Sequence, residues 1–220
     1  MCYNTHMIRI MKESAESYFR LEELNIGAFA EMKGKGMKFH TGVYDAEGAG
    51  RLCLMEMKGP AGLMHMDTGV FSPTEKDGPI FSFDYIKAAG KETLILELYD
   101  TTISHPAFAD LEEVKERYAH LSPHDPGEHW YDGLRLPVSD FKGGRKITDD
   151  INSMLRDYSD MYFTLLQECA PCDPVEKKKC NAAFADGLLA NGGPAVDAFR
   201  KMMGDERTEV FLSNYMFCCR

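Results

Sequence analysis

The sequence lacks any long apolar run. No stretch of about 18 apolar residues occurs among its 220 residues, so we expect no transmembrane helix. The opening segment, MCYNTHMIRIMKESAE, becomes charged too early for a secretory signal peptide. These two absences predict a cytoplasmic protein that does not enter a membrane.

Basic residues are scarce relative to acidic ones. The chain has 25 lysines and arginines against 35 aspartates and glutamates, which gives a formal net charge of −10. Such an excess of negative charge repels phosphate groups, so nucleic acid and anionic membranes are poor partners for this chain.

Several catalytic motifs are also missing. Gly34 and Gly36 are not followed by a complete G-x-G-x-x-G, so a dinucleotide fingerprint is not supported. The chain contains no P-loop and no G-x-S-x-G, so NTP hydrolysis and acyl transfer have no motif behind them.

Cysteine is present without a regular pattern. Seven cysteines are an odd number in a chain that is not small, so we interpret them as reduced thiols. Cys169 and Cys172 form a C-x-x-C pair near Cys180, and such a pair can also be a redox dithiol or part of a metal site.

Histidine offers a second metal hypothesis. His120, His124 and His129 are close in sequence, but Pro123 and Pro126 remove the helical spacing that would align them. We therefore expect no metal site. Methionine is abundant, with 14 residues, which fits either a deformable core or a pocket for a flat apolar ligand.

Runs of β-forming residues alternate with turn signals between residues 37 and 99. We predict strands over residues 37–44 and 51–58, and three more within residues 62–99. Helical periodicity marks residues 11–25, 106–120, 148–170, 173–189 and 194–217, and a long irregular connection covers residues 121–144. Short connections between strands predict a mostly antiparallel meander. The chain is therefore predicted to be one α+β domain over residues 1–220, a three-layer α/β/α sandwich.

Polar side chains interrupt two of the predicted strands. Period-2 alternation gives the first strand one face with Leu63, His65, Asp67, Gly69 and Phe71, and the second strand one face with Ile80, Ser82, Asp84 and Ile86. If the strands pair, His65, Asp67 and Asp84 can converge in an apolar pocket. The alternative is that both aspartates face solvent or cap turns.

The same stretch resembles the ferredoxin-dependent bilin reductases. The resemblance rests on the segment VFSP at residues 70–73, a short loop, and then PIFSFDYI at residues 79–86. A second, weaker similarity covers the closing helix, with RKMMGDE at residues 200–206, then Phe211-Leu212 and Met216-Phe217. The two motifs occur in the family's order, and the weaker resemblance spans roughly residues 50–217.

This resemblance implies that a linear tetrapyrrole binds between the sheet and the C-terminal helices. Electrons come singly from ferredoxin or flavodoxin, side chains supply protons, and no flavin, metal or other tightly bound cofactor is used. The central acid of the family corresponds to Asp84, the second proton-handling position falls on Asp67, and His65 either substitutes for Asp67 or assists it. The substrate-binding residues that follow from this interpretation are Phe71, Ile80, Ser82 and Ile86, with Arg135 for an anionic group of the ligand.

The chain departs from the family at the start of the last helix. Gly193 and Pro194 stand where the family often has an acidic and then a basic residue, so these functions are absent or moved to Asn191 or Asp197. This departure favours an alternative function, a non-catalytic tetrapyrrole carrier or sensor on the same fold.

The negative net charge also bears on electron transfer, because ferredoxin is acidic. A local basic patch at residues 142–146 or at Lys177, Lys178 and Lys179 could still receive it, since docking depends on local potential more than on total charge.

Overall fold

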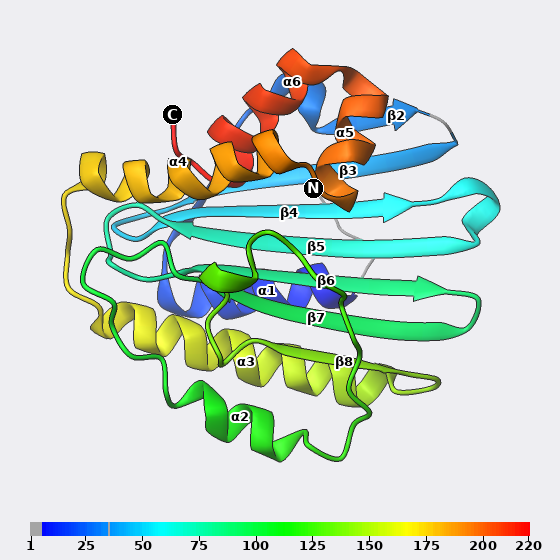
Figure 1. Ribbon diagram of the computed structural model, residues 1–220, viewed down its shortest axis with the longest axis horizontal. Coiled ribbons are helices and arrows are strands. Elements are labelled where there is room, and N and C mark those ends of the chain that lie inside the picture. Colours follow the sequence, from blue (N-terminus) through cyan, green and yellow to red (C-terminus); the bar gives the residue numbers. More distant parts are fainter. Residues whose placement is uncertain (1–5, 35) are drawn as a thin grey trace.

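The computed structural model describes residues 6–34 and 36–220, and across these residues eight strands form a single sheet. The strands are β1 (Leu21–Glu23), β2 (Glu31–Gly34), β3 (Met37–Ala46), β4 (Gly50–Lys58), β5 (Met64–Pro73), β6 (Ile80–Ala88), β7 (Lys91–Tyr99) and β8 (Asp140–Gly144). Their order is β1-β3-β4-β5-β6-β7-β8, with β2 also paired to β3 (Figure 1). Every neighbouring pair is antiparallel, so the predicted meander is confirmed.

Local turn chemistry explains the tightest hairpin. Ala88 pairs with Lys91, so only Ala89 and Gly90 connect β6 to β7. Their φ angles are 50° and 72°, which is the left-handed backbone that a two-residue type I′ turn requires. Glycine adopts this geometry without a Cβ clash, so the turn fixes the register of the two strands.

Helices cover both faces of the sheet. They are α1 (His6–Tyr18), α2 (Leu111–Arg117), α3 (Thr148–Glu168), α4 (Pro174–Asn191), α5 (Pro194–Met203) and α6 (Asp205–Val210), followed by a π-helical segment (Phe211–Met216). Short 3-10 turns occur at Gly27–Phe29, Pro60–Gly62 and Asp132–Leu134. Figure 1 shows α4, α5 and α6 grouped beside β3 and β4, and α2 and α3 beside β7 and β8.

Two apolar cores separate the layers. Leu94, Leu96 and Leu98 of β7 belong to the core that includes α1, α2 and α3. Alternate positions of β4, such as Met55 and Met57, belong to the other core, with α4, α5 and the π-helical segment. The predicted α+β class and three-layer α/β/α sandwich are therefore confirmed.

Several predicted boundaries are wrong. The helix expected over residues 11–25 lies at His6–Tyr18, and β1 occupies part of the remainder. Strand β2 at Glu31–Gly34 was not predicted, and the helix expected over residues 106–120 is only Leu111–Arg117. The helix expected over residues 194–217 is divided after Met203, because Gly204 has a φ of 82° and cannot continue a right-handed helix.

Helix α4 begins as its sequence predicts. Asp173 caps it, accepting hydrogen bonds from the backbone N–H groups of Val175 and Glu176, and Pro174 takes the first helical position. Lys177 does not form the predicted basic surface patch with Lys178 and Lys179, because it has no exposed surface.

The Lys177 Nζ donates hydrogen bonds to Gly78 O at 2.7 Å and to Thr101 O at 2.5 Å. Gly78 lies in the connection between β5 and β6, and Thr101 follows β7. Lys177 therefore ties α4 to two neighbouring loops at one end of the sheet.

Candidate functional site

The two faces of the central strands carry different polar groups. In the β5–β6 pair, Thr68 lies opposite Asp84, whereas Asp67 lies opposite Tyr85. Residues directly opposite each other point to the same side of a sheet, so Asp67 and Asp84 point to opposite sides. The prediction that His65, Asp67 and Asp84 converge on one face is wrong. The alternation within each strand is as predicted, but Asp84 pairs with Thr68 and not with Asp67, which places the two aspartates on opposite faces.

The face that carries Asp84 forms the floor of a cleft beneath α4 and α5. A cavity of about 380 Å³ and an adjoining cavity of about 110 Å³ share several lining residues. The shared residues are Met55, Asp84, Glu97, Tyr131, Ala195 and Phe199. A volume of this size with apolar walls and few polar groups is typical of a site for an organic ligand.

Methionine side chains make up much of the larger cavity. Its lining includes Met37, Met55, Met57, Met64 and Met66, with Phe39 and Phe199 beside them. Unbranched thioether side chains adapt their shape to a ligand and contact aromatic rings favourably. The sequence-based suggestion of a methionine-lined pocket for a flat apolar ligand is therefore consistent with the geometry.

Asp84 is the central polar group of the cleft floor. Burial raises its pKa to about 6, and the nearby negative charge of Glu97 acts in the same direction. The hydroxyl of Thr68 donates a hydrogen bond to Asp84 Oδ1 at 2.5 Å and opposes this shift by favouring the charged form. An acid with a pKa near neutrality can both release and recover a proton under ordinary conditions.

Glu97 is a second acid of the cleft that the sequence prediction missed. Tyr99 donates a hydrogen bond to Glu97 Oε2 at 2.5 Å, and Arg135 Nε donates one to Oε1 at 3.0 Å. The side chain of Glu97 is only 8% exposed. The available signal was its position in the strand LILELY at residues 94–99, where an acid interrupts an apolar run on the same face as Asp84.

The predicted substrate-binding residues are divided between the two faces. Ser82 lines the smaller cavity and Ile86 the larger one, whereas Ile80 is buried in the core on the cleft side. Phe71 does not belong to the cleft, because it packs in the opposite core, with its ring 5.1 Å from that of Phe163. Arg135 is absent from both cavity linings, and its guanidinium is paired with Glu97 at 2.9 Å.

The start of α5 borders the cleft, as the family resemblance implies. Gly193 lines the smaller cavity, and Ala195 lines both. Neither Asn191 nor Asp197 lines either cavity, so these residues do not replace the missing acid in the geometry described. The acids that line the cleft are Asp84 and Glu97, and both come from the sheet.

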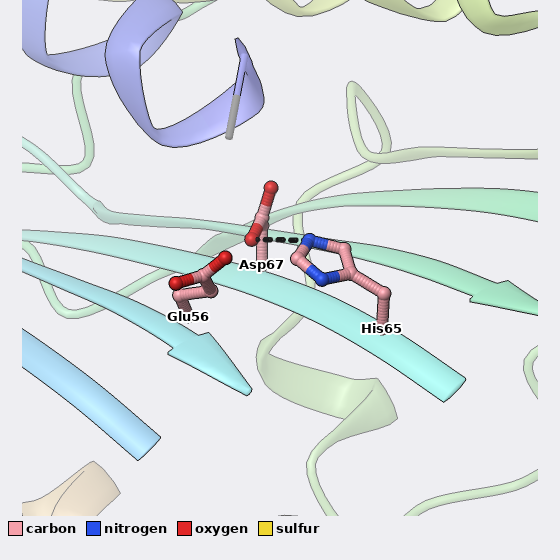
Figure 2. Close-up of side chains that lie close together, drawn as sticks. All are labelled: Glu56, His65 and Asp67. Carbon is pink, nitrogen blue, oxygen red and sulfur yellow. Dashed lines mark hydrogen bonds and ion pairs between the residues drawn. The ribbon is translucent and has the colours of Figure 1, made fainter. Parts of the chain in front are cut away.

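His65 and Asp67 form a separate polar cluster on the opposite face. His65 Nε2 lies 2.8 Å from Asp67 Oδ1, and this hydrogen bond raises the pKa of His65 against the opposing effect of burial. Glu56 lies directly across from Asp67 on β4. Figure 2 shows the three side chains on the same side of the two strands.

The cysteines behave as separate thiols. Cys53, Cys169, Cys172, Cys180, Cys218 and Cys219 are free, and Cys2 lies outside the described residues. Burial raises the pKa of Cys169 and of Cys172, which disfavours the reactive thiolate. Within residues 6–34 and 36–220, the one group of three potential metal ligands close together is Glu56, His65 and Asp67, so neither the cysteines nor the three loop histidines form such a group there.

Comparisons with known proteins support the architecture. No family model matches the chain, and no curated protein matches its sequence. Among solved structures, the chain is similar to phytochromobilin synthase from tomato, which was crystallised in complex with biliverdin. The TM-score is 0.72 at 13% sequence identity, over 97% of this chain and 82% of the tomato chain. This likeness is one of fold.

Among the described helices, none is both long enough and apolar enough to cross a bilayer.

Proposed function

We propose that the chain binds a linear tetrapyrrole in the cleft and reduces it with single electrons from ferredoxin or flavodoxin. The observation that carries this proposal is Asp84, a carboxyl with a raised pKa on the floor of an apolar, methionine-lined cleft. The fold shared with phytochromobilin synthase supports it, because that protein was crystallised with biliverdin.

Asp84 acts as the proton donor in this proposal. Reduction of one double bond takes two electrons from the external donor and two protons. The neutral carboxyl of Asp84 gives one proton to the electron-rich pigment, and the carboxylate that remains accepts the Thr68 hydrogen bond. Solvent then returns the proton to Asp84, which its pKa of about 6 allows near neutral pH, and the reprotonated carboxyl gives the second proton after the second electron arrives.

An anaerobic absorption titration tests the proposal directly. Biliverdin is added to the purified chain, and reduced ferredoxin follows. We expect a saturable change of the pigment spectrum and then new, shifted bands as the conjugated system shortens. Absence of saturable binding would remove the proposed function and leave the fold unaffected.

Substitution of Asp84 tests its assigned role. The Asp84→Asn variant keeps the size of the side chain and loses the acidic proton, so we expect pigment binding to persist and reduction to slow by about 100-fold or more. Ser82→Ala is the matched control, because Ser82 also lines the cleft but has no acid function here. Wild-type turnover in Asp84→Asn would exclude this residue as the donor.

A second candidate function is a tetrapyrrole carrier or sensor. The observation that favours it is the start of α5, where Gly193 faces the cavity without an acid. Binding of biliverdin with no further spectral change under a working electron donor would select this function over the reductase.

The electron donor would require a basic contact surface. Lys142 and Lys177 are buried, so neither of the two predicted basic patches is complete at the surface. Arg145 and Lys146 are exposed and remain for this role. A double charge reversal, Arg145→Glu with Lys146→Glu, is expected to slow reduction by ferredoxin while biliverdin binding stays unchanged, because a rim charge acts mainly on association.

A further inference from the structure

The cluster of Glu56, His65 and Asp67 lies outside the proposed tetrapyrrole site. Glu56 comes from β4, and His65 and Asp67 come from β5, on the face that packs toward α1 (Figure 2). One ligand atom from each side chain lies within 4.8 Å of the others. None of the three lines the cleft that contains Asp84, so the proposed reduction does not use them.

The two carboxylates are placed at an energetic cost. Glu56 and Asp67 are directly opposite each other on neighbouring strands, and they are only 4% and 1% exposed. Like charges in this position repel, and burial removes the water that would screen them. A cation between the two carboxylates would offset both costs.

The lysine that contacts Glu56 is partly exposed. Lys58 Nζ lies 2.9 Å from Glu56 Oε1, but the lysine side chain is 46% exposed. Glu56 Oε1 is itself buried, and among the described residues no group donates a hydrogen bond of good geometry to this oxygen. A lysine at the surface can swing into solvent and leave the carboxylate to another cation.

The distances suit a metal ion. His65 Nε2 and Asp67 Oδ1 are 2.8 Å apart, close to the roughly 3 Å that separates neighbouring ligands on an ion bound at about 2.1 Å. A cavity of about 260 Å³ adjoins His65 and Asp67 and is also lined by His6 and Asn152, which leaves room for water ligands. One imidazole with two carboxylates matches a first-row transition ion better than Ca²⁺ or Cu⁺, which prefer all-oxygen and sulfur ligands respectively.

We propose that Glu56, His65 and Asp67 form a binding site for a divalent first-row transition-metal ion. The ion would replace the proton between His65 and Asp67 and displace Lys58 from Glu56. It would join β4 to β5 on the face opposite the cleft.

Manganese is the most suitable probe for this site. Mn²⁺ prefers oxygen and nitrogen ligands, so the cysteines of the chain do not compete for it as they would for zinc. Metal-free, untagged, full-length protein is titrated with Mn²⁺, and loss of the aqueous Mn²⁺ signal is followed by electron paramagnetic resonance. We expect saturable binding of one ion per chain, with a rise in the thermal unfolding temperature, because a ligand that binds the folded state stabilises it.

Variants locate the ion. His65→Gln and the double variant Glu56→Gln with Asp67→Asn are expected to weaken binding by more than the roughly 10- to 100-fold that loss of an outer-shell partner costs. The matched control is Glu31→Gln with His40→Gln, a less buried pair of the same residue types on β2 and β3 whose side chains are 3.9 Å apart. It should bind Mn²⁺ as the wild type does.

Several outcomes would overturn the proposal. They are absence of saturable binding up to millimolar Mn²⁺, unchanged affinity in His65→Gln, or an equal loss in the Glu31/His40 control. If the double variant does not fold, His65→Gln alone decides, because His65 is 23% exposed and its replacement leaves both carboxylates in place.

Discussion

Two aspartates on neighbouring strands show how strongly the surroundings of a residue set its chemistry. Asp84 faces an apolar cleft and has Thr68 as its hydrogen-bond partner, so burial dominates and its pKa rises to about 6. Asp67 faces the other side of the sheet and lies within 2.8 Å of an imidazole nitrogen. The first arrangement suits proton transfer, and the second suits a cation.

The raised pKa of Asp84 predicts a pH dependence. Only the neutral carboxyl donates a proton, and its fraction falls as the pH rises through about 6. We therefore expect the rate of reduction to fall with rising pH around an apparent pKa near this value. Single-turnover absorption measurements across this range, at saturating biliverdin and donor, give the profile. The same profile in Asp84→Asn would assign the titration to another group.

Glu97 is expected to tune that profile. Its negative charge raises the pKa of Asp84, so Glu97→Gln should move the apparent pKa of reduction to a lower value. Biliverdin affinity, measured in parallel, separates this effect from a change in the shape of the cleft. Glu92→Gln, an acid on the same strand that contacts α3 rather than the cleft, is the comparison that should leave the profile unchanged.

The sequence predicts which single residues have a special role better than it predicts which residues contact one another in the fold. Asp84 was identified because an acid in the middle of a strand, between Phe83 and Tyr85, has no turn to cap. Its pairing with Thr68 rather than Asp67 depends on the length and conformation of the connection over residues 74–79. Period-2 alternation within each strand is equally compatible with either phase, so it could not decide between them.

At the scale of single elements, α4 is held by a buried lysine. The Lys177 ammonium satisfies the carbonyl groups of Gly78 and Thr101, and burial lowers its pKa. The sequence EKKK at residues 176–179 gives no sign that one lysine of the three points inward, because their local environments differ only in the tertiary structure.

Replacement of Lys177 tests the attachment of α4. Lys177→Met fills the same space but leaves two buried carbonyl groups without a donor, so we expect the free energy of unfolding to fall by about 2–4 kcal/mol. Lys179→Met, at an exposed position of the same helix, should change it by less than about 0.5 kcal/mol. Urea denaturation followed by circular dichroism measures both. Equal effects would show that the hydrogen bonds of Lys177 are unimportant for stability.

Element boundaries were predicted well where a local signal marks them. Asp173 and Pro174 located the start of α4, and Gly192 located its end, because capping and glycine conformations are local properties. Strands β1, β2 and β8 were missed. They are short, and each pairs along one neighbouring strand, β1 and β2 with β3 and β8 with β7, so their own sequences carry little signal.

At the scale of the whole molecule, the cleft exists because three distant parts of the chain meet. Strands β3 to β7 line one side of the cleft, and α4 and α5 line the opposite side. Tyr131 comes from the long connection before β8. The order of strands and helices predicted the layers. It could not predict that residues 121–139 would close one side of the cleft, since no periodicity marks such a segment.

That connection also contains the one tryptophan of the sequence, Trp130. Its ring packs on α4, where a Cβ on Gly187 would lie 2.2 Å from it, and its centroid is 6.1 Å from that of Phe184. Phe184 lines the smaller cavity, so a bound pigment would lie near the indole. We expect biliverdin to quench the fluorescence of Trp130 in step with the absorption titration. Free tryptophan at matched absorbance corrects for light absorbed by the pigment. Saturable absorption changes without quenching would place the pigment elsewhere.

Consecutive residues of β5 belong to different compartments of the molecule. Asp67 faces α1, and Thr68 faces the cleft beneath α4 and α5. A substitution on one side of the strand therefore leaves the side chains on the other side unchanged. Each face can be redesigned for a new ligand separately. Insertion of a single residue into this strand has the opposite effect, because it would exchange the two faces and move the aspartate to the cleft and the threonine to the side that faces α1.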